Sequence, residues 1–319
     1  MAMSHKHFTR DDRVKLAVLL KTGITKKEIG RILHKNPSSI RREIKRNRHR
    51  GKYLPGRARM KSKERKTHRK KKIEHDRVLK TYILKKLKQY WSPEQIAGRL
   101  RRKHIVICHE TIYGYIIRHK TLKKYLRCRK GKYRRRHGTI AREKQREYGK
   151  KRWIGERPDI INERERIGDW EGDTIIGKER TKRILTHVER KTGYLIADFL
   201  PTVSAEIVAE KIAQRFKKLP RQKRHSITYD NGTEFSSHEI IERKTNATVY
   251  FANPYHSWER GTNENTNGLL RQFFPKGSSF ATITEEDVER AVKLLNRRPR
   301  KRLEFSTPYE IFSAFHSRT

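Results

Sequence analysis

Cysteine is almost absent from the chain, and so are long apolar runs. Among 319 residues only Cys108 and Cys128 are cysteines, and they do not form a C-x-x-C pair. We therefore expect neither a disulfide framework nor a structural zinc site, and a reducing cytoplasm is the expected compartment. No apolar run approaches the roughly 18–20 residues that span a bilayer, and residues 1–10 lack the apolar stretch of a signal peptide. We expect no membrane partner.

Acidic residues are also scarce. The chain has 35 Asp and Glu against 81 Lys and Arg, a formal net charge of +46, and only 33% hydrophobic residues. Residues 1–160 hold 53 basic and 13 acidic residues, whereas residues 161–319 hold 28 and 22. The two halves are therefore electrostatically distinct. A chain this basic favours a nucleic acid or an anionic surface as its partner.

Residues 9–47 have the pattern of three short helices. Thr25 and Glu28 form a capping box before the second helix, and Asn36-Pro37 supplies an N-cap and a first-turn proline for the third. The third helix has apolar residues on one face and small or basic residues on the other. This predicts a helix-turn-helix DNA-binding domain over residues 1–47, although an ordinary helical bundle would share the pattern. The DNA-contacting candidates are Ser38, Ser39, Arg41, Arg42, Lys45 and Arg46.

A second unit of the same kind is predicted over residues 74–118, with another capping box at Ser92-Pro93-Glu94-Gln95. Its last helix is less basic, so packing or dimer contacts are the alternative to DNA reading. Residues 48–73 are basic and have no apolar period, which predicts a linker that follows phosphates. Residues 119–164 are expected to be a second basic linker.

From about residue 165 the pattern changes to strands and helices in alternation. Strands are expected at residues 170–176, 183–189, 194–200, 226–229 and 248–251. Three strands, a helix, a strand, a helix, a strand and a helix predict an α/β domain with a mixed sheet over residues 165–275. A helical extension over residues 276–319 follows. The expected fold class is thus multidomain, α plus α/β.

Three acidic residues of this α/β domain are the main candidates for chemistry. Asp173 lies in the first strand, Asp230 ends the fourth, and Glu264 lies on a later helix. If the two strands are neighbours, the three carboxylates can meet at one edge of the sheet. Such a trio suits two Mg²⁺ ions, or Mn²⁺, which are the usual equipment for cutting and joining phosphodiesters. Other acids stay open as ligands or structural residues: Asp169, Glu171, Asp198, Glu234 and Glu259.

The helix that carries Glu264 has a composition that does not favour a helix. Gly261 and Gly268 each cost roughly 1 kcal/mol relative to alanine, and three asparagines are also weak helix formers. We expect a close approach of the DNA backbone to account for them. The candidates for holding the scissile phosphate share a face with Glu264, and they are Arg260, Asn267 and Arg271.

Taken together, these segments resemble the DDE-class transposases of bacterial insertion sequences, and among them the IS-thirty family. The resemblance is carried by WEGDTIIG (170–177), TYDNGTEF (228–235), the GTNEN-containing segment 250–277 and LNRRPRKRLEFSTPYE (295–310). The segments TKKEIGRILHKNPSSIRREIKRN (25–47) and WSPEQIAGRL (91–100) resemble the family's two helix-turn-helix units. The resemblance spans nearly the whole chain.

The resemblance implies a ribonuclease-H-like, retroviral-integrase-like catalytic domain with Asp173, Asp230 and Glu264 as the metal ligands. It also implies that donor strands are cut at the terminal inverted repeats of the element and that their 3′-hydroxyl ends attack target DNA. The implied partners are double-stranded DNA and further copies of the chain, in a dimer or higher oligomer that synapses two ends. The implied location is the bacterial cytoplasm, on the nucleoid. Two rival classes of function are a regulator that only binds DNA and a host nuclease or resolvase of the same fold.

Overall fold

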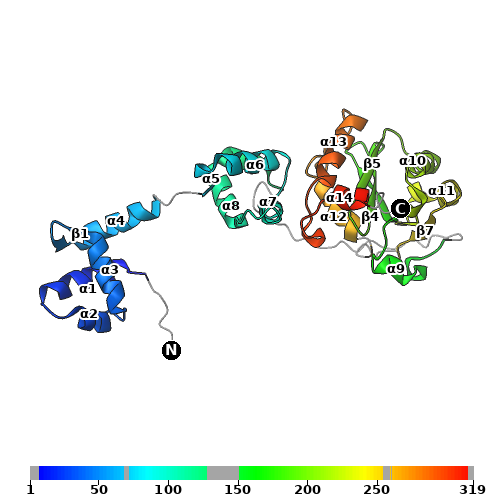
Figure 1. Ribbon diagram of the computed structural model, residues 1–319. Coiled ribbons are helices and arrows are strands. Elements are labelled where there is room, and N and C mark those ends of the chain that lie inside the picture. Colours follow the sequence, from blue (N-terminus) through cyan, green and yellow to red (C-terminus); the bar gives the residue numbers. More distant parts are fainter. Residues whose placement is uncertain (1–6, 68–71, 128–150, 254–258, 260, 315–319) are drawn as a thin grey trace, which may run out of the picture. The chain divides into compact units, whose positions relative to one another are not determined.

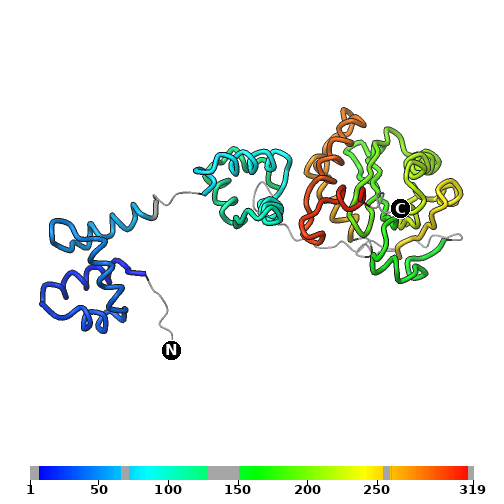
Figure 2. Tube along the Cα trace, viewed as in Figure 1, coloured from blue at the N-terminus to red at the C-terminus, as the bar shows by residue number. Residues whose placement is uncertain are grey.

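The computed structural model describes residues 7–67, 72–127, 151–253, 259 and 261–314. The chain divides into two compact units, Met1–Arg77 and Val78–Thr319. The first unit is built of helices and one short hairpin, and the second contains a sheet flanked by helices (Figure 1, Figure 2). Within these described ranges, no helix is long and apolar enough to cross a membrane.

The first unit begins with the three predicted helices, α1 (Arg10–Lys21), α2 (Lys26–Ile32) and α3 (Pro37–Asn47). Thr25 and Glu28 close the predicted capping box at the start of α2, and Asn36 caps α3 ahead of its first-turn proline. The three helices share one small apolar core, which consists of Leu16, Ile29, Leu33, Ile40 and Ile44.

Residues 48–67 fold as part of this unit, so the predicted linker over 48–73 is wrong for most of its length. They form the hairpin of β1 (Arg48–His49) and β2 (Lys52–Tyr53) and then α4 (Pro55–Thr67), and α5 (Lys72–His75) follows. In α4, Ala58 is fully buried and Lys61 donates to the Arg48 carbonyl at 3.1 Å. The sequence of α4 is mostly basic and has no apolar period, so no helix could be predicted from it. Its basic side chains instead donate hydrogen bonds to backbone oxygens, as Lys61 does.

The second unit begins with the helices expected for residues 74–118. They are α6 (Arg77–Lys88), α7 (Pro93–Arg101) and α8 (His109–Arg118), followed by the 3₁₀ helix η1 (Lys120–Tyr125). The predicted capping box at Ser92 and Gln95 forms at the start of α7. Half of the basic segment expected over 119–164 lies outside the described residues, namely 128–150.

These helices pack against the C-terminal segment of the same unit. Arg99 donates to the Phe305 carbonyl at 3.1 Å and forms an ion pair with Glu310. Arg102 donates to the Ser306 hydroxyl at 2.5 Å, and the Phe305 ring lies against Gly98. The region predicted as a separate domain over 74–118 is therefore joined to the α/β part by specific contacts.

The sheet has five strands in the order β5-β4-β3-β6-β7. They are β3 (Asp169–Ile176), β4 (Arg183–Glu189), β5 (Leu195–Leu200), β6 (Ser226–Tyr229) and β7 (Thr248–Phe251). β3, β4 and β5 are antiparallel, whereas β6 and β7 run parallel to β3. The short helices η2 (Ile154–Glu156) and α9 (Asp159–Asn162) precede the sheet. The predicted mixed sheet is confirmed.

Helices cover both faces of the sheet (Figure 1). On one face, α10 (Ala205–Lys217), α11 (His238–Thr245) and α14 (Pro308–Ala314) enclose a core that includes Trp170 and Tyr229. On the other face lie α12 (Gly261–Leu270) and α13 (Glu285–Asn296). The side chains along each strand alternate between these two cores, as the period of a strand requires.

The region predicted as a helical extension, residues 276–319, is an integral part of the sheet domain. Val288, Ala291 and Leu295 of α13 are buried against the sheet. The Asn296 side chain also exchanges two hydrogen bonds with the backbone of Leu195 on β5, both at 2.8 Å. A boundary at residue 275 would therefore cut through one hydrophobic core.

Candidate active site

β3 and β6 are adjacent strands, which the sequence hypothesis for the acidic residues required. They pair in parallel, with Glu171 of β3 opposite Thr228 of β6. The same register continued by two residues sets Asp173 beside Asp230, which directly follows β6, and both are half-buried. Neighbouring strands lie about 4.7–4.9 Å apart. Two of the three candidate acids therefore come to the same edge of the sheet.

The two alternative acids on β3 already have structural partners. Asp169 is 1% exposed, accepts from the Arg166 guanidinium at 2.9 Å and from the Ser226 hydroxyl at 2.6 Å. Glu171 is fully buried and forms an ion pair with Arg190. Buried carboxylates are tolerated only with such partners. Asp173 is the least buried of the three acids of β3.

Helix α12 is held on the sheet by amides on successive turns. The backbone N–H of Asn263 donates to Glu171 at 3.0 Å. One turn later, Asn267 Nδ2 donates to Asp173 Oδ2 at 2.7 Å, and its Oδ1 accepts from the Thr186 hydroxyl at 3.1 Å. The Asn263 side-chain oxygen also accepts from the Thr186 hydroxyl, at 3.4 Å. Both asparagine side chains therefore contact the strands, which accounts for them without an approach of DNA. Asn267 fixes the orientation of the Asp173 carboxylate.

Glu264 lies beside this row of asparagines and is exposed. One residue turns an α-helix by about 100°, so Glu264 flanks the sheet-facing side of α12 instead of pointing into it. Among the described residues, no group of three acidic, histidine or cysteine side chains could hold a metal ion. The donor set itself suits a hard cation, because Asp173, Asp230 and Glu264 all offer carboxylate oxygens. That the three acids join in one coordination sphere therefore stays a prediction.

A fourth carboxylate, Glu234, lies next to Asp230. It follows Asp230 on the 3₁₀ helix η4 (Thr233–Phe235), and a methyl group placed on Gly232 would be within 3.0 Å of both carboxylates. Glu234 accepts from the Arg183 guanidinium at 2.6 Å and from the Thr174 hydroxyl at 2.8 Å. These contacts attach the loop after β6 to the first two strands. Glu234 thus fixes the backbone that presents Asp230.

The two remaining acids from the sequence analysis are also engaged elsewhere. Asp198 is 1% exposed and forms an ion pair with Arg215 at 2.8 Å, and burial raises its pKa. Glu259 accepts from the backbone and the side chain of Asn253, both at 2.9 Å. Neither residue joins the edge that carries Asp173 and Asp230.

The structure describes two of the three residues that were predicted to hold the scissile phosphate. Arg260 lies outside the described residues. Arg271 follows α12 and donates to the Ile176 carbonyl at 3.2 Å, at the end of β3. Asn267 contacts Asp173, as described above. The structure therefore gives Arg271 and Asn267 structural contacts beside the candidate site, and their contact with a phosphate stays a prediction.

The predicted DNA-reading face of α3 is open to solvent. Ser38, Arg41, Arg42, Lys45 and Arg46 are exposed, and Ser39 is half-buried. Arg41 and Lys45 line a cavity of about 870 Å³ that α3 shares with α1, α2 and the β1–β2 hairpin. Its other basic lining residues are Lys21, Lys26, Arg48 and Lys52, and no acidic residue lines it. Six cations without a carboxylate favour an anionic ligand.

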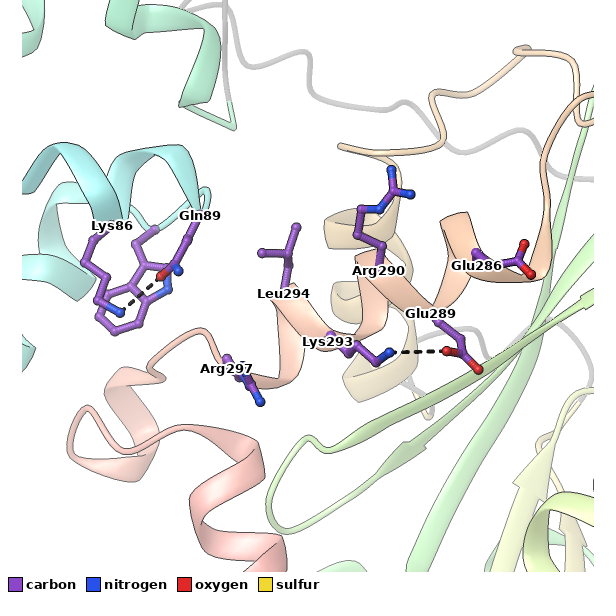
Figure 3. A pocket seen from close by; sticks show the side chains of 9 residues that line it. Lys86, Gln89, Glu286, Glu289, Arg290, Lys293, Leu294 and Arg297 are labelled. Atoms are coloured by element: carbon purple, nitrogen blue, oxygen red, sulfur yellow. Dashed lines mark hydrogen bonds and ion pairs between the residues drawn. The ribbon is translucent and has the colours of Figure 1, made fainter.

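A further cavity, in the second unit, is lined by both basic and acidic residues. It measures about 490 Å³ and lies between α6 and α13 (Figure 3). Lys86 donates to Gln89 at 3.1 Å, and Lys293 is paired with Glu289 at 3.3 Å. Burial, followed by nearby cations, lowers the pKa of Lys86. None of the predicted site residues lines this cavity, and its charges are of both signs.

Sequence reasoning missed the residues that position the candidate acids. Thr174, Thr186 and Arg183 contact them or their neighbours from β3 and β4, and Glu234 was left open as a ligand or a structural residue. Asn263 and Asn267 lie one helical turn apart in the sequence, a spacing that indicates that both side chains lie on the same face of the helix. Their partners lie 77 to 94 residues away in the chain, so no local pattern names them.

Comparisons with known proteins cover both units. Residues 4–47 match a helix-turn-helix domain family. The chain is 40% identical over 315 residues to the transposase for insertion sequence element IS4351 of Bacteroides fragilis, and the match covers 96% of this chain and 95% of that protein. It is 34% identical over 319 residues to the transposase InsI for insertion sequence element IS30A of Escherichia coli strain K12, with 96% and 83% coverage.

A similarity to solved structures concerns the sheet domain. The catalytic core domain of BIV integrase matches with a TM-score of 0.38 and 24% sequence identity, and the match covers 47% of this chain and 97% of that chain.

Proposed function

Because the chain belongs to the IS-thirty family of insertion-sequence transposases, we propose that it cuts and joins DNA at the ends of its own element. In this proposal it binds the terminal inverted repeats, cleaves the donor strands and transfers their 3′-hydroxyl ends to target DNA. The observation that carries the proposal is the placement of Asp173 and Asp230 on neighbouring strands, with the helix of Glu264 hydrogen-bonded to Asp173 through Asn267.

Asp173, Asp230 and Glu264 are the proposed catalytic residues and the proposed ligands of two Mg²⁺ ions, with Mn²⁺ as the alternative. Such ions, when bound, would activate the attacking oxygen and stabilise the leaving one. The chain's own residues orient these acids. Asn267 holds Asp173 from α12, and Arg183 with Thr174 holds Glu234 and the loop that carries Asp230.

DNA binding is assigned in the proposal to the exposed basic face of α3. Arg41, Arg42, Lys45 and Arg46 would contact the repeat, with Ser38 and Ser39 at the start of the helix, where a recognition helix approaches base edges. Two ends must meet during transposition, so we also propose that the active form is a dimer or higher oligomer. The proposed location is the bacterial nucleoid, because that is where the DNA lies.

The test compares acid variants in cleavage and joining of a labelled terminal repeat with Mg²⁺. We expect Asp230→Asn and Glu264→Gln to reduce both reactions by at least three orders of magnitude, on the order of what loss of an essential catalytic group costs. Binding to the repeat should stay within about twofold. Glu239→Gln is the matched control, because Glu239 is an exposed acid of α11 away from this edge.

Undiminished cleavage by the Asp230→Asn, Glu264→Gln double variant would overturn the catalytic assignment. Wild-type protein that binds the repeat but never cleaves it would favour the regulator that only binds DNA. Cleavage without any preference for the repeat would favour a general nuclease of the same fold.

A further inference from the structure

A small cavity beside the first half of α12 is lined by arginines without any acidic residue. It measures about 180 Å³, and its lining residues are Arg164, Gly193, Gly261, Thr262, Asn265, Thr266, Arg300 and Arg302. Asn265 directly follows Glu264, so the cavity lies on the same helix as the proposed catalytic acid. It is formed by three separate segments that meet α12: the loop after α9, the β4–β5 turn and the segment after α13.

The three arginines donate to neutral oxygens. Arg164 donates to the Thr262 hydroxyl at 2.9 Å, Arg302 to the Lys191 carbonyl at 2.6 Å and Arg300 to the Leu295 carbonyl at 3.3 Å. A carbonyl or hydroxyl satisfies a donor but does not cancel its charge. The cavity therefore keeps a concentration of positive charge, which the more distant Glu171 and Glu189 offset only in part.

Burial, and after it the neighbouring arginines, lowers the pKa of two of these arginines. Burial and then the neighbouring Arg302 and Arg127 lower the pKa of Arg300 to about 10. Burial and then Arg164 lower the pKa of Arg302 as well. Cations held this close destabilise one another unless an anion joins them. A ligand with negative charge would relieve that repulsion.

The surrounding groups suit a tetrahedral oxyanion. Guanidinium groups present their N–H donors in a fork that matches phosphate oxygens. Gly261 begins α12, and the backbone at the start of a helix adds N–H donors and partial positive charge. Among the residues that the structure describes, a methyl group on Gly261 would meet no atom within 4 Å.

We propose that this cavity binds one phosphodiester phosphate of the DNA strand that the active site processes. The identity of that DNA rests on the proposed function, whereas the anion chemistry of the cavity does not. Gly261 of the cavity and Glu264 are three residues apart on α12, a spacing that makes residues neighbours on one face of a helix. The bound phosphate is therefore a near neighbour of the scissile phosphate, and the cavity sets the register of the strand along α12.

The experiment measures binding of the full chain to a terminal repeat in the absence of divalent metal, so that catalysis plays no part. Single phosphates around the cleavage position are replaced one at a time by uncharged methylphosphonates. The variant is Arg164→Gln with Arg302→Gln, which spares the more buried Arg300. Lys301→Gln is the matched control, because Lys301 neighbours Arg302 and is 77% exposed but does not line the cavity.

We expect one methylphosphonate position to weaken binding of the wild type and of Lys301→Gln by about tenfold, the usual loss for a hydrogen bond to a charged group. The same position should have no effect on the double variant. The slope of log affinity against log salt should fall by about 0.9 in the double variant, as for one lost phosphate contact on a duplex. Unchanged tryptophan fluorescence would show that the double variant is folded.

Equal methylphosphonate profiles for the wild type and the double variant would overturn the proposal. A thermal-shift series with inorganic phosphate tests whether the cavity binds a free phosphate ion instead of a phosphate of DNA. If phosphate stabilises the wild type but not the double variant, and no methylphosphonate position matters, the cavity binds a free anion and the DNA assignment is wrong. Failure of the proposed function would appear separately, as continued cleavage by Asp230→Asn.

Discussion

The ion pair of Glu171 and Arg190 supports the strand that presents Asp173, and its removal gives a defined test. Glu171 is fully buried and the Arg190 side chain is 5% exposed. The Glu171 carboxylate also accepts from the backbone of Asn263 in the first turn of α12. We predict that Arg190→Met destabilises the second unit strongly, because it leaves a buried carboxylate without its counter-ion.

The size of the effect follows from this burial. Breaking a buried ion pair by removing one partner costs about 3–5 kcal/mol, whereas replacing both partners is often close to neutral. The double variant Glu171→Gln, Arg190→Met should therefore be more stable than Arg190→Met alone, since an amide can still accept from Asn263. Lys293→Met breaks the exposed pair with Glu289 and should cost at most about 0.5 kcal/mol.

Urea unfolding followed by tryptophan fluorescence measures these differences. All four tryptophans, at positions 91, 153, 170 and 258, belong to the second unit, so the signal reports that unit alone. A loss below about 1 kcal/mol for Arg190→Met, similar to that for an exposed pair, would refute the structural role of Glu171. Glu171 would then have to be reconsidered beside Asp173 as a candidate ligand.

Two further predictions concern pH and DNA binding. Burial lowers the pKa of His187 from 6.5 to about 3. Below about pH 6.5 the imidazole is protonated in the unfolded chain but stays neutral in the folded chain. The free energy of unfolding therefore falls by about 1.4 kcal/mol per pH unit between about pH 6.5 and pH 3. Free energies of unfolding measured at pH 7 and at pH 5 should therefore differ by about 2 kcal/mol more in the wild type than in His187→Gln, and an equal pH dependence would contradict the buried neutral imidazole. Arg41→Ala and Arg42→Ala should each weaken binding to the terminal repeat by about tenfold and reduce its salt dependence in a gel-shift titration, whereas unchanged binding would exclude α3 as the reader of the ends.

The architecture of the sheet domain could be predicted from short patterns. The expected bounds of β4, β6 and β7 agree with those observed, because each is a largely apolar run between clear stop signals. The predicted caps at Thr25, Asn36 and Ser92 also form. Such signals are local, so one sequence is sufficient to find them.

The errors at residue 275 and at the asparagines involve partners that lie far away in the chain, whereas the linker error involves a helix without an apolar period. The linker prediction failed for α4 because that helix packs with Ala58 and with basic side chains, which leave no apolar period. The boundary at residue 275 failed because Asn296 and the apolar face of α13 contact β5, about 100 residues earlier. Asn263 and Asn267 were assigned to DNA approach, whereas their amides bind the sheet.

The central claim is that Asp173, Asp230 and Glu264 form one metal site, and iron-directed cleavage of the protein tests it most directly. Fe²⁺ replaces Mg²⁺ in the full chain, and ascorbate with peroxide then cuts the backbone beside the bound ion. The account predicts cuts near residues 173, 230 and 264, all three lost in Asp230→Asn and suppressed by excess Mg²⁺. Cuts that persist in Asp230→Asn, or that miss the region of Glu264, would contradict a shared site.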